Sequence, residues 1–83
     1  MYQNVPNPFN GTTAIKFYVP ENVEVTIGVY NMLGEYVAEV TSDIFSIGKH
    51  AVTFDAHDLG QGTYFVRMNT DNFTQNQIIN LVK

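Results

Sequence analysis

Apolar and polar residues alternate along most of this chain with a period of two. The alternation is most regular in residues 23–30, where every second position is aliphatic: Val23, Val25, Ile27 and Val29. Because successive side chains of a β-strand point to opposite faces of the sheet, this pattern predicts a strand with one face in a core. The same period predicts further strands at residues 13–19, 35–41, 50–55, 63–68 and 73–83. No segment carries a sustained helical period, so we expect an all-β chain.

Turn-forming residues separate these segments. Asn31 and Gly34 bound a connection with the preferences of a type I turn, so residues 23–41 are predicted to form a β-hairpin whose return strand buries Val37. Residues 42–48 are less regular but apolar, and we expect a short edge strand or a crossover lying on the core. Strands of this length with a turn between each pair favour an immunoglobulin-like antiparallel β-sandwich of about seven strands.

One loop runs directly into a strand and predicts how the two sheets are joined. Leu59, Gly62 and Tyr64 have the spacing of a tyrosine corner, in which a tyrosine hydroxyl bonds back to the loop backbone. Tyr64, Val66 and Met68 then share one face of the strand. A plain glycine turn followed by an edge strand is the alternative.

Length and charge limit the function classes. The chain has 83 residues and no Cys, which predicts a single domain, residues 1–83, without disulfides. The formal net charge is −4, and the four basic residues are far apart, which argues against nucleic acid and anionic membrane surfaces as partners. The apolar runs are too short for a membrane-inserting helix. Met1 precedes a turn-rich segment, and we expect it to be a start codon added to a piece of a longer protein.

Candidate chemistry is sparse. His57 lies between Asp55 and Asp58, where a metal site or a simple turn are the two interpretations. His50 lies on a predicted strand, no Cys is present, and neither serine lies in a nucleophile elbow. We therefore expect no enzymatic activity, no catalytic residue, no cofactor and no bound metal.

Aromatic residues offer a second candidate site. Five of them would form a platform for carbohydrate binding if they shared one exposed face: Tyr2, Tyr18, Tyr30, Tyr36 and Phe65. Cover for neighbouring strands is the alternative role. In the N-terminal turn, Asn7 and Pro8 direct Phe9, which we expect to close one end of the core rather than contact a ligand. Asn10 and Asn72 each begin a match to the glycosylation sequon.

Four stretches together resemble the C-terminal sorting domain of the type IX secretion system, also called the Por secretion system. They are residues 3–15 around Asn7-Pro8-Phe9, residues 29–37 around Gly34, residues 48–64 with Leu59, Gly62 and Tyr64, and the apolar end at residues 78–83. The resemblance covers nearly the whole chain in order. The chain departs from the family at Val5, often aromatic there, at Gly11, often Pro, and at Gln77, near which the family often has a basic residue.

The resemblance implies that the domain functions as a sorting signal. Such domains end large secreted cargo proteins, pass through the periplasm, and direct the N-terminal cargo through the outer-membrane type IX translocon to the cell surface or the medium. A sortase-like peptidase usually removes the domain. The resemblance places recognition on the terminal strand, at Ile78, Ile79, Leu81, Val82 and Lys83. An immunoglobulin-like accessory or carbohydrate-binding module of a secreted glycosidase or adhesin is the alternative.

Overall fold

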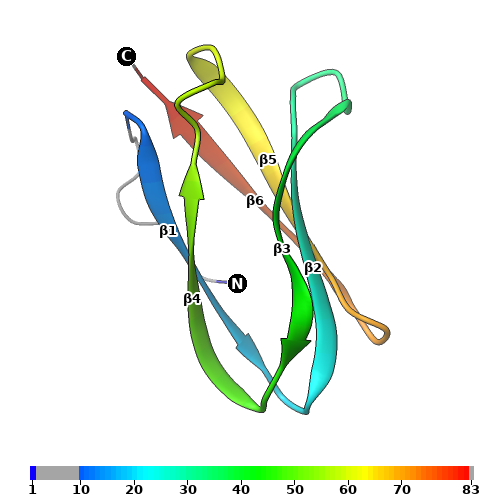
Figure 1. Cartoon of the computed structure of the whole chain (residues 1–83). Helices are drawn as coiled ribbons and strands as arrows, with labels where there is room; N and C mark the ends of the chain where they lie inside the picture. The colour runs from blue at the N-terminus through cyan, green and yellow to red at the C-terminus, as the bar shows by residue number, and fades with distance from the viewer. Residues whose placement is uncertain (2–9, 83) are drawn as a thin grey trace.

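The computed structural model describes residue 1 and residues 10–82, and these residues form six β-strands and no helix (Figure 1). The strands are β1 (Thr12–Val19), β2 (Val23–Tyr30), β3 (Tyr36–Phe45), β4 (Gly48–Asp55), β5 (Gly62–Asn69) and β6 (Thr74–Leu81). The all-β prediction is therefore confirmed. Asn7, Pro8, Phe9 and Lys83, like Tyr2, lie outside the described residues.

The strands form two antiparallel sheets. β1 pairs with β4, and the larger sheet has the order β3-β2-β5-β6. The pair β1–β4 faces the larger sheet, in the manner of a sandwich (Figure 1). About seven strands were predicted, and the described residues form six, because residues 42–45 continue β3. The immunoglobulin-like topology stays a prediction.

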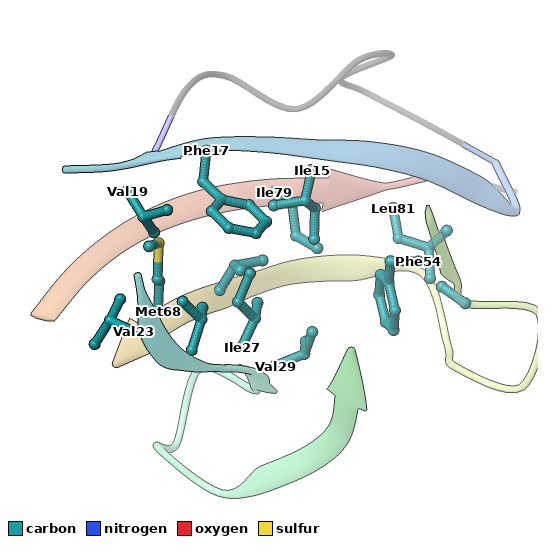
Figure 2. Packing of buried hydrophobic residues seen from close by; sticks show 13 residues of the cluster. Ile15, Phe17, Val19, Val23, Ile27, Val29, Phe54, Met68, Ile79 and Leu81 are labelled. Carbon is teal, nitrogen blue, oxygen red and sulfur yellow. The ribbon is translucent and has the colours of Figure 1, made fainter. Parts of the chain in front are cut away.

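The core lies between the two sheets, on the faces that the alternation predicted. Figure 2 shows Phe17 of β1 pointing into the interior that Ile27 of β2 and Ile79 of β6 also enter. All three side chains are fully buried. Burial of these apolar side chains is the main favourable contribution to folding. The chain has no cysteine, so no disulfide adds to it.

The third strand differs most from its prediction. Residues 42–45 continue β3 and do not form a separate edge strand, so the crossover to β4 is reduced to Ser46 and Ile47. The β2–β3 register shifts twice, between Ile27 and Gly28 and between Val29 and Tyr30. Residues 42–44 are exposed, so this end of the strand has no alternation of buried and exposed positions that would reveal its length. Val37 packs against the core but is only half-buried.

The tyrosine corner is present. The Tyr64 hydroxyl donates a hydrogen bond of 2.6 Å to the Gly60 carbonyl oxygen. In the same loop, the Leu59 amide donates to the Ala56 carbonyl oxygen at 3.0 Å, and Leu59 packs against the core. This loop joins β4 of the smaller sheet to β5 of the larger one, so the corner fixes the passage between the layers.

The β2–β3 turn is organised by one side chain. Asn31 Oδ1 accepts hydrogen bonds from the backbone amides of Leu33 at 2.9 Å and Glu35 at 3.0 Å. Gly34 has a φ of +84°, a conformation that residues with a Cβ rarely adopt. The turn holds Met32 and Leu33 out toward solvent, and 85% of the Leu33 surface is exposed.

Candidate functional site

The last strand lies at an edge of the larger sheet. β6 pairs with β5 in unbroken register from Asn69↔Thr74 to Gly62↔Leu81. Within the part of the chain that the structure describes, no strand pairs with the opposite side of β6. An edge strand presents a row of backbone donors and acceptors that a strand from another protein can pair with.

The two faces of β6 separate the predicted recognition residues. Ile79 and Leu81 point into the core with exposures of 0% and 2%. Ile78 and Val82 remain about half exposed, at 52% and 47%. A partner that meets the folded domain can therefore touch the side chains of Ile78 and Val82, whereas those of Ile79 and Leu81 hold the strand in place.

The two edges of the larger sheet are built differently. β3 carries two register shifts and the acidic residues Glu39 and Asp43, and bulges and charges are common devices that prevent an edge from pairing with other chains. β6 has a regular register, and residues 74–82 contain no charged side chain. Of these two edges, β6 is the one suited to accept another strand.

A row of apolar side chains crosses the outer face of the larger sheet. Tyr30 pairs with Tyr36 on one side and with Phe65 on the other, and Phe65 pairs with Ile78. Three members of the predicted aromatic platform therefore come together: Tyr30, Tyr36 and Phe65. Tyr18 does not join them, because it lies on β1 in the other sheet.

The next row places a cation beside these rings. Gly28 pairs with Arg67, and Arg67 pairs with Asn76. The Arg67 guanidinium lies over the Tyr30 ring at 5.0 Å from its centroid, and its Nε donates to Asn76 Oδ1 at 3.1 Å. Gly28 makes room for this packing, since a Cβ there would approach the Tyr36 ring to 2.9 Å.

These residues line an open hollow of about 500 Å³. Its walls come from Tyr30 and Phe65 of the outer row, from Arg67 and Asn76, and from the exposed β2–β3 turn. Sequence reasoning did not assign Met32, Leu33, Arg67 or Asn76 to any site. The signal that finds them is the strand register, because β2, β5 and β6 align these positions only through long-range pairing.

The two histidines make local hydrogen bonds and ring contacts. The His57 backbone amide donates a hydrogen bond to Asp55 Oδ1 at 3.0 Å, and the Nδ1 atom of the His57 ring contacts the same oxygen. These hydrogen bonds hold the pKa of Asp55 below its ordinary value of 3.8. Among the described residues, no three potential metal ligands cluster. His50 stacks on Phe17, and its Nε2 donates to the Ser46 carbonyl oxygen at 2.6 Å.

Comparison with known proteins supplies the family. The sequence model of the family described as secretion system C-terminal sorting domain matches residues 4–81, nearly the whole chain. Neither the curated proteins nor the solved structures give a match. The described residues contain no helix that is long and apolar enough to cross a membrane. The family match confirms the resemblance found in the sequence and favours a sorting signal over an accessory or carbohydrate-binding module. This chain belongs to the family of type IX secretion C-terminal sorting domains, a family of sorting signals and not of catalysts, and it acts as the sorting signal of a secreted or cell-surface cargo protein.

Proposed function

We propose that the outer-membrane type IX translocon recognises the open edge of β6 by adding a strand to it. The supporting observation is the contrast between the edges of the larger sheet. β6 is regular and uncharged over residues 74–82, whereas β3 carries bulges and two acidic residues. Backbone pairing at such an edge supplies affinity, and side chains on alternate positions supply specificity.

The rest of the domain serves as a rigid support for this strand. Ile79 and Leu81 anchor β6 in the core, so the edge is presented in one fixed geometry. The exposed side chains of Ile78 and Val82 then carry specificity, together with Lys83, which the resemblance places in the same recognition segment.

The family match supports a proposed order of steps around this recognition. The cargo precedes residues 1–83, which act as one domain with an immunoglobulin-like sandwich fold, and it reaches the periplasm by its own signal. The translocon then carries the cargo to the surface or the medium, and a sortase-like peptidase removes the domain. In this scheme the domain is a substrate of the machinery.

A reporter fusion tests the role of the terminal strand. The chain is fused to the C-terminus of a periplasmic reporter in cells with an active type IX system, and the medium, surface and periplasm are assayed. We expect export of the intact fusion and periplasmic retention when residues 79–83 are deleted. Circular dichroism of the truncated domain accompanies the assay, because loss of Ile79 and Leu81 also weakens the core. Normal export of the truncated fusion would contradict the proposal.

A further inference from the structure

The outer face of the larger sheet carries a second surface, separate from the edge of β6. We call it the aromatic–arginine face and define it by Tyr30, Tyr36, Phe65 and Arg67, with the adjoining turn residues Met32 and Leu33. Tyr36 is 56% exposed and Met32 is 62% exposed. Aromatic residues, Met and Arg are the types enriched in the cores of protein–protein interfaces.

Among the described residues, Arg67 makes no ion pair. The nearest acid in its row is Glu39, which lies on the far side of Gly28 and does not line the hollow. The Arg67 Nε donates a hydrogen bond to Asn76, and the guanidinium lies over the Tyr30 ring. These two contacts fix the position of the guanidinium. A fixed guanidinium next to an apolar hollow is complementary to a carboxylate beside an apolar side chain.

The shape of the face favours a protein segment over a glycan. The rings of Tyr30 and Tyr36 meet edge to face, with centroids 5.5 Å apart and an interplanar angle of 70°, so they do not form a flat platform for a sugar ring. The exposed side chains of Met32 and Leu33 line this hollow as well. The side chains that line the hollow include the cation of Arg67 and no acid, which favours a segment that carries a carboxylate.

We propose that the aromatic–arginine face docks a segment of another protein in which a carboxylate neighbours an apolar side chain. The carboxylate pairs with Arg67, and the apolar side chain enters the hollow between the β2–β3 turn and Phe65. This docking surface is distinct from strand addition at β6, so the domain offers two contacts on adjacent sides.

Two matched peptides test the proposal on the purified chain, without the translocon. The probes are acetyl-Gly-Phe-Asp-Gly-amide and the same peptide with Asn in place of Asp, titrated to millimolar concentration into the ¹⁵N-labelled chain. We expect amide shifts centred on Tyr30, Phe65 and Arg67, and binding about tenfold tighter for the Asp peptide, as expected for one charge-assisted pair. Arg67→Gln abolishes the difference between the peptides. Lys16→Gln removes a charge from the other sheet and leaves the difference unchanged.

Several outcomes would overturn the proposal. If millimolar peptide causes no amide shifts, or if the two peptides bind equally, the face does not recognise a carboxylate. Shifts at the same residues with maltohexaose but with neither peptide identify a glycan site instead. Dimerisation in light scattering, lost in Arg67→Gln, identifies a second copy as the occupant. Because no export is measured, each of these results leaves the role of β6 untouched.

Discussion

The Tyr64 hydroxyl donates to the Gly60 carbonyl oxygen across 2.6 Å, and this bond ties the start of β5 to the loop that arrives from β4. The two strands belong to different sheets, so one side chain fixes the connection between the layers. The same side chain is partly buried and packs against the core. Tyr64 therefore acts on stability, and its removal leaves the edge of β6 chemically unchanged.

We expect Tyr64→Phe to lower the free energy of unfolding by about 1 kcal/mol, because it removes one hydrogen bond and keeps the ring. For a domain of this size that corresponds to a fall in Tm of roughly 4–8 °C. Urea unfolding measures the loss. Tyr36→Phe is the control. Because the Tyr36 side chain is largely exposed, this substitution should change the free energy of unfolding by less than about 0.5 kcal/mol. Equal stability of the two variants would contradict the role of the corner.

Gly34→Ala is expected to destabilise the domain by roughly 1–2 kcal/mol, since φ is +84° there and a Cβ penalises this backbone conformation. A Cβ at Gly34 would meet no atom within 4 Å, so the cost arises from the backbone alone. Gly34→Asn is the matched variant and should lose less, because Asn tolerates positive φ. Thermal unfolding compares the two, and an equal loss would show that the strain argument does not hold.

Substitutions of the neighbouring residues Ile78 and Ile79 distinguish an effect on recognition from an effect on folding. Ile79→Ala leaves a cavity in the core and should cost about 2–5 kcal/mol, whereas Ile78→Ala should change stability by less than about 0.5 kcal/mol because its side chain is half exposed. If the exposed face of β6 contributes to recognition, Ile78→Ala reduces export of a reporter fusion while the domain stays folded. Chemical denaturation and the export assay are read on the same variants. Full export of Ile78→Ala would assign recognition to the backbone edge alone.

Asp55 makes part of the stability pH-dependent. The pKa of its carboxyl group is lower in the folded chain than its ordinary value of 3.8, so the unfolded chain binds the proton more tightly. The stabilisation is present above pH 3.8 and is lost as the pH falls through the folded-state pKa. Asp55→Asn should therefore lose less stability than the native chain between about pH 6 and about pH 3. Asp58→Asn keeps the His57–Asp55 contacts and is the control; identical acid profiles for Asp55→Asn and the native chain would refute the linkage.

The period of two predicted most strands because they are buried on one face only. Val23 to Val29 alternate cleanly, and β2 has the bounds that the pattern predicts. The pattern failed along β3, where two bulges and an exposed edge remove the periodic burial. The corner was predictable from local spacing, since Gly60 and Tyr64 are close in sequence.

The candidate site was predictable only in part. The apolar end of the chain indicated a terminal strand, but its place at an edge depends on strand order, which long-range pairing decides. The same holds for the outer row: nothing in the sequence near Tyr30 shows that Phe65 lies beside it. Register, and not composition, brings Arg67 over the Tyr30 ring.

Recognition of the open edge of β6 is tested most directly by a proline scan of residues 75–80 in the reporter fusion. Amide groups along a strand point alternately toward β5 and toward the open edge, and proline removes the amide hydrogen. Substitutions at positions bonded to β5 should unfold the domain, whereas those at the intervening positions should leave it folded, as proline on an edge strand does. We predict that the folded proline variants remain in the periplasm. Export of these folded variants at the native level would contradict recognition by strand addition.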